Sequence, residues 1–231
     1  MSTVWKCSRL RNSGLAVDQD ARRYNYLGDF RRNPIVNPLG TESGKIEIFS
    51  KKIESYKYDD CPAHPTWLEP TEWLGAKMAE EYPFALLTSK SRYRLHSQLD
   101  STASNLFANV EDREPVWMHP DAAKKLGLKS GDIAKVTSRR GSVLAGVIIT
   151  DRIRPDTVVI HHGGWYSPEE PGEEGTLDVH GCDNVLTIDI PSSKLSCGNV
   201  ANSTQVKIER WDDELDPIMA HVQPKTVRAD D

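Results

Sequence analysis

The chain has 231 residues, of which 38% are hydrophobic and 27% are charged, and its formal net charge is −5. This composition is typical of a globular chain with enough apolar residues for a core, and the length fits one large domain or one domain plus an appended segment. The negative charge argues against a general nucleic-acid or membrane-surface binder. No run of about 18 apolar residues is present, so we expect no transmembrane helix, and the opening residues lack the apolar region of a secretory signal.

The first 81 residues show no compact core of their own. Residues 1–45 are polar and rich in turn residues. Residues 45–50 alternate between apolar and polar, which predicts a short strand, and residues 70–82 form a plausible helix that ends before Pro83. We therefore expect residues 1–81 to be an irregular segment that covers another part of a larger body.

The pattern changes at Tyr82, where short strands begin to follow one another. We predict strands in residues 84–89, in two stretches of 130–150 around a turn at 139–142, in the run that starts at 157, and in 184–190 and 204–210. Residues 119–128 predict a short helix, with Pro120 and Asp121 in its first turn and Gly127 at its end.

This succession predicts a mainly β fold, a β-barrel with helical insertions, from Tyr82 onward. No internal repeat or low-complexity segment is evident. Residues 213–231 look like a polar, mobile tail.

The reactive side chains form no recognisable catalytic or metal-binding motif. The cysteines do not form a C-x-x-C pair, so we expect four free thiols, although Cys182 and Cys197 could pair across a loop. The other two cysteines are Cys7 and Cys61. His161 and His162 are adjacent on a strand and so face opposite sides, which argues against a metal pair. We predict no catalytic residue and no metal ligand.

Polar side chains instead crowd the ends of three predicted strands. Arg92 and Arg94 would offer planar guanidinium groups that match phosphate oxygens. Gln98, Asn184 and Asn199 carry paired donors and acceptors suited to a purine or pterin edge. If the barrel closes, these ends can converge on one rim, which predicts a nucleotide-like ligand with phosphates.

Plainer interpretations remain open for several of these residues. His96 alone would more often be a surface histidine, and Trp165 and Tyr166 could cap the core. The sequence contains neither G-x-x-x-x-G-K-[ST] nor G-x-G-x-x-G, so P-loop and Rossmann interpretations fail.

Several long blocks of the sequence together resemble a known family. They include "YPFALLTSKSRYRLHSQLD", "HHGGWYSP" and "GTLDVHGCDNVLTIDIPSSKLSCGN", with "NPLGTESGKIEIFS" and "DDCPAHPTWLEP" upstream. In this order they resemble the C-terminal part of the molybdenum enzymes of the dimethyl sulfoxide reductase family. The branch is that of trimethylamine-N-oxide, dimethyl sulfoxide and biotin sulfoxide reductases.

The resemblance implies a fold, a cofactor and its contacts. Residues 82–212 would form a molybdopterin-dinucleotide-binding domain, a double-psi β-barrel, and residues 1–81 the C-terminal end of the preceding oxidoreductase domain. The cofactor would be molybdenum bis(molybdopterin guanine dinucleotide). The implied cofactor contacts are Thr88, Ser89, Arg92, Arg94, His96, Ser97, Gln98, Gly163, Trp165, Tyr166, Asn184, Gly198 and Asn199. Two departures are His162, where an acidic residue is common, and Cys182–Asp183, where a small residue and proline are usual.

The resemblance also implies a function. The chain would bind the cofactor as the C-terminal portion of an S- or N-oxide reductase. The family's molybdenum ligand belongs to an upstream segment, so we expect the chain alone to be inactive. Its partners would be the upstream catalytic domains, a small S- or N-oxide substrate and an electron-donating cytochrome, and the periplasm is favoured over the cytoplasm. A non-catalytic stand-alone cofactor-binding module, or a remnant of a split gene, is the alternative.

Overall fold

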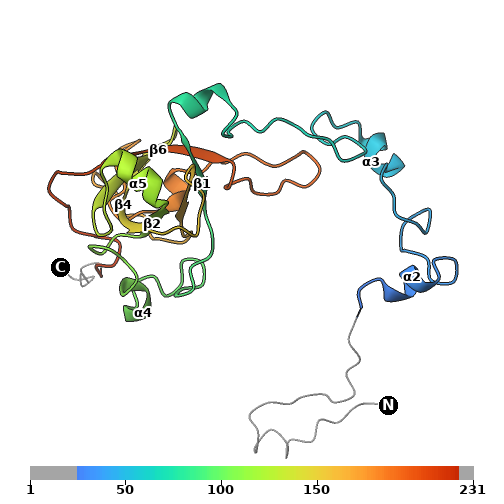
Figure 1. Ribbon diagram of the computed structural model, residues 1–231, viewed down its shortest axis with the longest axis horizontal. Helices are drawn as coiled ribbons and strands as arrows, with labels where there is room; N and C mark the ends of the chain where they lie inside the picture. The colour runs from blue at the N-terminus through green and yellow to red at the C-terminus, as the bar shows by residue number, and fades with distance from the viewer. Residues whose placement is uncertain (1–24, 224–231) are drawn as a thin grey trace, which may run out of the picture. The chain divides into compact units, whose positions relative to one another are not determined.

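The computed structural model describes residues 25–223, which divide into two compact units. The smaller unit contains residues 25–56 and 62–65, and the larger contains residues 57–61 and 66–223. The larger unit carries the barrel labelled in Figure 1. No helix within the described residues is long and apolar enough to span a bilayer.

The smaller unit contains two short helices, α2 (Gly28–Arg32) and α3 (Lys51–Tyr56). The strand predicted over residues 45–50 is wrong, because this stretch is irregular up to the start of α3. Ile46 is 71% exposed and Ile48 is 75% exposed, so neither face of the stretch is buried to hold a strand in register.

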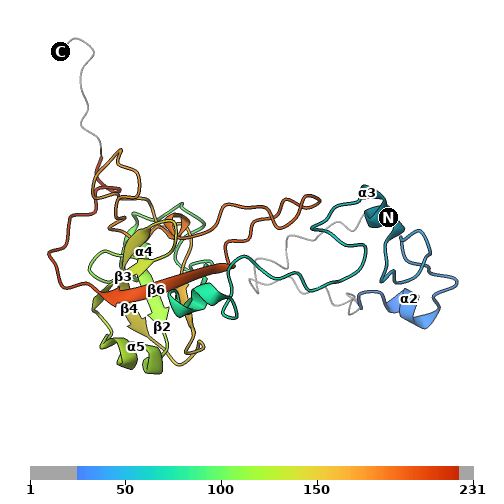
Figure 2. The ribbon, with the colours of Figure 1, turned by 90° about the horizontal axis from the view of Figure 1, so that it is seen from above.

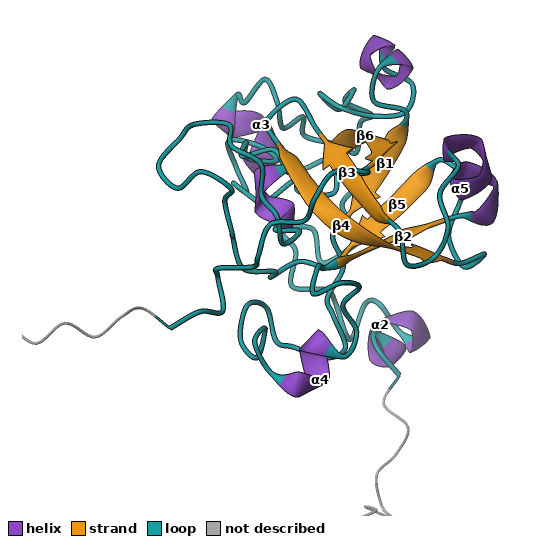
Figure 3. Cartoon of the chain, turned by 90° about the vertical axis from the view of Figure 1, so that its left-hand side faces the viewer, coloured by secondary structure: helices purple, strands orange, loops and turns teal. Residues whose placement is uncertain are grey.

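The larger unit is built on a closed barrel of six strands in the order β1-β5-β2-β4-β3-β6. The strands, shown in Figure 3, are β1 (Phe84–Leu87), β2 (Pro115–Met118), β3 (Ile133–Thr137), β4 (Ser142–Ile149), β5 (Thr157–Ile160) and β6 (Thr204–Arg210). The prediction of a mainly β barrel with helical insertions is therefore confirmed. The sequence analysis did not single out β2 as a strand.

The direction of each strand pair decides where the strand ends lie. β1 pairs with β5 and β2 pairs with β4 in parallel, whereas the other four neighbours are antiparallel. Because the parallel strands β1 and β5 run side by side, the segments that leave their carboxyl ends emerge at the same edge of the barrel.

The core lies inside the barrel and is lined by side chains from all six strands. Leu86, Val116, Val136, Val147 and Ile160 are completely buried there. β5 is buried along its whole length, which is typical of a strand covered on both faces. At about 1.5–3 kcal/mol for each buried large aliphatic side chain, this core is the main source of stability.

A second apolar cluster covers the outside of β3 and β4. Ile133 and Leu144 pack there with the partly buried Trp211, Leu215 and Ile218. The main-chain N–H of Met219 also donates to Ser167 Oγ at 3.0 Å. Residues 213–223 are thus irregular chain with two apolar side chains, Leu215 and Ile218, packed against the barrel. The mobility expected of residues 213–231 stays a prediction.

The helix and the turn predicted in the barrel region are confirmed. Helix α5 (Pro120–Leu126) starts with Pro120 and ends at Gly127, whose φ of 68° is the left-handed conformation that glycine adopts without strain. β3 and β4 form an antiparallel hairpin, closed by a hydrogen bond from Ser138 N to Gly141 O of 2.9 Å.

Two further predicted elements are wrong. The helix expected over residues 70–82 is reduced to the 3₁₀-helix η1 (Lys77–Glu80), because Glu72 reaches away to bond the barrel. The strand expected over residues 184–190 is also wrong. This stretch begins with the 3₁₀-helix η2 (Asp183–Val185) and continues as irregular chain, in which the Leu186 side chain is buried in the core. A fourth short helix of the unit is α4 (Ala103–Leu106).

The cysteine prediction is confirmed where the structure describes it. Cys61, Cys182 and Cys197 are free thiols, and Cys7 lies outside the described residues. Cys182 is buried, and this burial raises the pKa of its thiol to about 12.

Candidate functional site

The loops that follow β1 and β5 lie side by side at one edge of the barrel. The main-chain N–H of His162 donates to Ser89 O at 3.0 Å, and a parallel bridge between Lys90 and His162 extends the pairing of the two strands. We call residues 88–100, 161–166 and 183–184 the rim.

Gly163 is the point where the three segments of the rim meet. A Cβ at this position would lie 2.1 Å from the carbonyl oxygen of His96, and its φ of +99° is in the region that favours glycine. The Gly163 N–H donates to Asp183 Oδ1 at 3.3 Å. The ends of β1 and β5 therefore converge as predicted, and the third segment joins them at η2, although the strand predicted there does not form. Glycine at position 163 is what allows the close approach.

Two aromatic side chains of the rim lie at the surface. Trp165 is 39% exposed, and its Nε1–H donates to the carbonyl oxygen of Ser97 at 2.7 Å. Tyr166 is 50% exposed. Neither ring is part of the apolar core, so the interpretation of this pair as core caps is not supported, and both side chains are partly open to solvent.

The two arginines predicted to hold phosphate lie in different surroundings. The Arg94 side chain is completely buried, and its Nη1 donates to Glu114 Oε2 at 2.5 Å. Its Nη2 donates to the carbonyl oxygens of His161 at 2.8 Å and His162 at 3.0 Å. Arg94 therefore joins the two rim loops from beneath, and both ends of its planar group already have protein acceptors.

Arg92 is exposed and presents its guanidinium to solvent. Its Cζ lies 5.7 Å from the ring centroid of Tyr93. Of the two predicted phosphate ligands, Arg92 is thus the one whose position in the structure suits an incoming anion.

Two buried acidic side chains, Glu114 and Asp183, contact residues of the rim. Burial raises the pKa of Glu114 to about 7, against the opposing effect of the hydrogen bond from Arg94. Burial likewise raises the pKa of Asp183, and it lowers the pKa of His161. Sequence reasoning missed Glu114 and Asp183 because nothing in a local pattern shows that an acidic side chain will be enclosed.

The other predicted contacts in the rim have mixed surroundings. Ser89 Oγ and His161 Nδ1 are hydrogen-bonded at 2.9 Å, and the His96 ring lies 5.2 Å from the His162 ring. The Thr88 N–H donates to Asn202 Oδ1 at 2.8 Å. Gln98 and Asn184 are exposed, with their amide groups at the surface.

Gly198 and Asn199 lie apart from the rim. They belong to a loop, residues 191–199, that extends from the barrel (Figure 2) and is closed by a hydrogen bond from Ser192 N to Gly198 O of 2.8 Å. Lys194 ties this loop to Asp59 with a 2.6 Å ion pair. Within residues 25–223, neither Gly198 nor Asn199 is hydrogen-bonded to the rim.

Comparison with known proteins defines the class to which this barrel belongs. Residues 84–205 match the family described as "Molydopterin dinucleotide binding domain". This match covers more than half of the chain, so the chain belongs to that family, and its barrel is a domain for a molybdopterin cofactor.

Two relatives narrow the class further. The chain is 47% identical over 208 residues to trimethylamine-N-oxide reductase of Haemophilus influenzae, with 90% of this chain and 25% of the relative covered. It is 44% identical over 206 residues to dimethyl sulfoxide/trimethylamine N-oxide reductase of Rhodobacter capsulatus, with 89% and 25% covered. The resemblance to the C-terminal part of the dimethyl sulfoxide reductase family is thus confirmed.

A solved structure shows the same fold. Acetylene hydratase from Pelobacter acetylenicus matches with a TM-score of 0.60 and 23% identity, over 76% of this chain and 24% of that one. This chain spans about a quarter of the length of the curated relatives it matches.

Proposed function

We propose that the rim binds molybdopterin guanine dinucleotide, and that this chain is the C-terminal portion of an S- or N-oxide reductase. The observation that carries the proposal is the parallel pairing of β1 with β5 in a chain of this family. This pairing puts the loop of residues 88–100 beside that of residues 161–166, so that one ligand can contact both.

The groups on the rim fit a ligand with phosphates and a flat polar ring system. Arg92 offers a planar cation for a phosphate, and Gln98 and Asn184 offer amide donors and acceptors for a ring edge. Trp165 and Tyr166 offer partly exposed aromatic side chains. When bound, the molybdenum centre would supply oxygen-atom transfer, while these side chains bind and orient the cofactor.

The finer parts of the proposal rest on the family resemblance. They are two copies of the guanine dinucleotide on one molybdenum, a double-psi topology of the barrel, and a periplasmic enzyme of anaerobic respiration that takes electrons from a cytochrome. The names of the two reductases above support an S- or N-oxide as the substrate.

Exposed apolar side chains favour a part of a larger enzyme over a stand-alone cofactor-binding module. In the smaller unit, Ile35 is 90% exposed and Ile48 is 75% exposed. In the larger unit, Trp67 is 70% exposed. Such side chains on a stable protein usually mark surfaces that another domain covers. The upstream catalytic domains are the covering partner that the length of the relatives supports.

The proposal is tested in the assembled enzyme, produced together with its upstream domains. We would replace Arg92 by Ala and measure molybdenum by mass spectrometry and released guanine nucleotide by chromatography, each per mole of polypeptide. A charge-assisted hydrogen bond to phosphate contributes about 1.5–3 kcal/mol, so we expect at least roughly tenfold weaker cofactor retention on dilution.

Arg152→Ala is the matched control, because Arg152 is an exposed arginine in the connection before β5, at the opposite end of that strand. Its cofactor content should equal that of the parent enzyme. Equal cofactor retention in the Arg92 and Arg152 variants would contradict the proposal that the rim binds the cofactor. Full molybdenum content and reductase activity in the 231-residue chain alone would instead overturn its status as a portion of the enzyme.

A further inference from the structure

Beneath the rim, three segments far apart in the sequence bring together two imidazoles and a carboxylate. The residues are Asp100, His180 and His221, and their possible ligand atoms all lie within 4.8 Å of one another. Asp100 ends the first rim loop, His180 precedes Gly181 in the chain that covers β4, and His221 comes from the C-terminal tail. The sequence gives no hint of this cluster because its members are about 40 to 120 positions apart.

The deepest member, His180, is held in the tautomer that metal-binding histidines usually have. Its side chain is completely buried, and its Nδ1 donates to the carbonyl oxygen of Trp165 at 2.8 Å. Its other ring nitrogen, Nε2, is buried and has no hydrogen-bond partner among the described residues. A histidine whose one N–H is fixed by a backbone carbonyl presents the lone pair of its other nitrogen, which is the tautomer that binds a metal ion.

Asp100 has its own supporting contacts. Its carboxylate is completely buried, and Oδ1 lies 3.2 Å from the Asn105 amide nitrogen and 3.4 Å from Arg94 Nη1. Its Oδ2 accepts from the Trp165 N–H at 3.2 Å and faces His221 Nε2 at 2.8 Å. Oδ2 also lies 3.9 Å from His180 Nδ1, so this oxygen faces both histidines, and both carboxylate oxygens are held by protein donors.

We propose that Asp100, His180 and His221 bind a divalent cation of the zinc class, with a water molecule as the fourth ligand. Two imidazoles and one carboxylate are the donors that zinc takes in sites with one open position, whereas magnesium and calcium prefer oxygen ligands alone. His221 would carry its proton on Nδ1, because Nε2 must offer its lone pair to the ion.

The cation would have a structural role beneath the rim. It would tie the tail to the rim loop and to the segment that holds His180. The His221 ring lies 5.6 Å from the Trp165 ring and 4.8 Å from the His180 ring. Because Trp165 is also bonded to Ser97, a cation at this cluster would restrain the two rim loops together.

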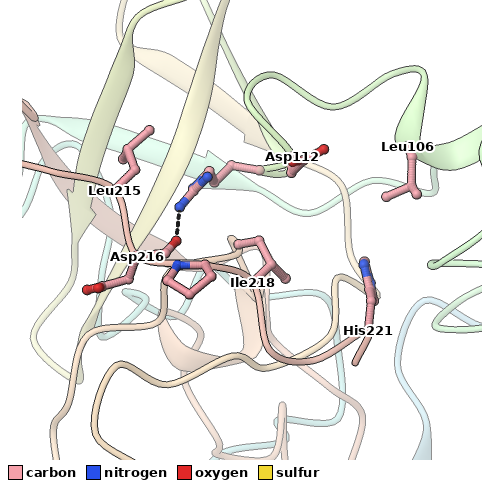
Figure 4. Close-up of a pocket in the computed structure, with 8 residues that line it drawn as sticks. Leu106, Asp112, Leu215, Asp216, Ile218 and His221 are labelled. Atoms are coloured by element: carbon pink, nitrogen blue, oxygen red, sulfur yellow. Dashed lines mark hydrogen bonds between the residues drawn. The ribbon is translucent and has the colours of Figure 1, made fainter. Parts of the chain in front are cut away.

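An access route for the ion is present. His221 lines a pocket of about 430 Å³ together with Leu106, Asp112 and Ile218 (Figure 4). His221 is partly exposed, whereas His180 and Asp100 are buried. An ion can therefore enter from the pocket, contact His221 first and then reach the two buried ligands, without unfolding of the barrel.

The test is isothermal titration of the full chain with zinc chloride, with magnesium chloride as the second arm. We expect one zinc per chain and no magnesium binding. His221→Gln, which removes only the partly exposed ligand, should weaken zinc binding by at least about 10–100-fold, because replacing even a residue that only supports a metal ligand costs this much. His162→Gln, which removes a histidine from the neighbouring His96–His162 pair, should leave the zinc affinity unchanged.

Cobalt substitution separates this site from the thiols of the chain. The cobalt complex should lack the intense thiolate charge-transfer absorption that cysteine ligation produces. Zinc affinity that is equal in the parent and in His221→Gln, a thiolate band in the cobalt spectrum, or no zinc binding at all would each overturn the proposal. In those cases the three side chains form only a hydrogen-bonded network.

Discussion

Arg94 Nη1 lies 2.5 Å from Glu114 Oε2, and neither side chain is more than 2% exposed to solvent. The pair connects the rim to the residue that precedes β2. Because Arg94 also bonds two carbonyl oxygens of the 161–162 segment, both of its Nη groups have protein acceptors. Its role in the structure is to hold the rim in shape, whereas Arg92 faces outward.

Replacement of Arg94 by Ala should therefore lower the stability of the chain. The change leaves Glu114 buried without its cation and two carbonyl oxygens without a donor, and the loss of one partner of a buried pair costs roughly 3–5 kcal/mol. The midpoint of urea unfolding measures the loss. Arg92→Ala is the control, and as an exposed substitution it should change the free energy of unfolding by less than about 0.5 kcal/mol. If the two variants unfold at the same urea concentration, Arg94 is not the internal support described above.

Glu114 should make the stability depend on pH. Burial raises the pKa of Glu114 from 4.5 to about 7 in the folded chain. Since the folded chain then binds this proton more tightly than the unfolded chain does, the contribution of the group to stability is complete below pH 4.5 and is lost as the pH rises to about 7. The loss should be on the order of 3 kcal/mol.

Urea unfolding of the parent and of Glu114→Gln across this pH range isolates the effect. Gln keeps an oxygen acceptor for Arg94 and cannot ionise, so the variant should gain stability relative to the parent as the pH rises. Parallel stability profiles in the two proteins would show that Glu114 does not hold a proton in the folded state.

Gly163 should tolerate no side chain. In Gly163→Ala the new Cβ would meet His96 O at 2.1 Å in addition to the strain of a positive φ. Gly172→Ala is the matched control, because its φ is +94° and no atom lies within 4 Å of the added Cβ. Strain of this kind costs about 1–3 kcal/mol. We expect Gly163→Ala to lose more than the control by a further 1–3 kcal/mol or so, the usual effect of forced overpacking. Equal melting temperatures would contradict the close approach of the rim loops.

Glu72 should anchor the chain that enters the barrel. Its carboxylate binds Arg140 through two bonds of 2.6 and 3.1 Å and accepts the Gln205 N–H at 2.9 Å. Arg140→Lys cannot reproduce the two-bond geometry, so it should destabilise the chain by about 1 kcal/mol or more. Arg139→Lys, at the exposed neighbouring arginine, is the control for chemical denaturation. If Arg140→Lys and Arg139→Lys lower the free energy of unfolding equally, the two-bond geometry at Glu72 does not contribute to stability.

The strands and α5 could be predicted from the sequence because their patterns are local. Alternating or continuous apolar residues mark β3 to β6, and Pro120 and Gly127 mark the limits of α5. The helix predicted over residues 70–82 was wrong because the Glu72 side chain binds Arg140, which is distant in the sequence. The strand predicted over residues 184–190 was wrong because Leu186 enters the core from a loop and not from a paired strand.

The rim could be predicted only in part. The convergence of strand ends follows from closure of the barrel, and the family resemblance pointed to the same residues. The sequence could not separate Arg92 from Arg94, since both look alike until the fold encloses one of them. It also could not reveal Asp100, His180 and His221, which only the tertiary structure brings together.

Closure of the barrel sets an order of events during synthesis. Phe84 in β1 pairs with Val206 in β6, so the first strand of the barrel has one of its two partners only when nearly the whole domain has been made. Its other partner, β5, is also made later. Ribosomes add roughly 5–20 residues per second, so β1 lacks one or both partners for seconds after it emerges. Such long-range pairing is slow and leaves an apolar strand edge exposed meanwhile. The rim continues directly from β1, so it cannot take its final form before β6 exists. Any ligand that needs the complete rim must therefore arrive after translation has passed the last strand.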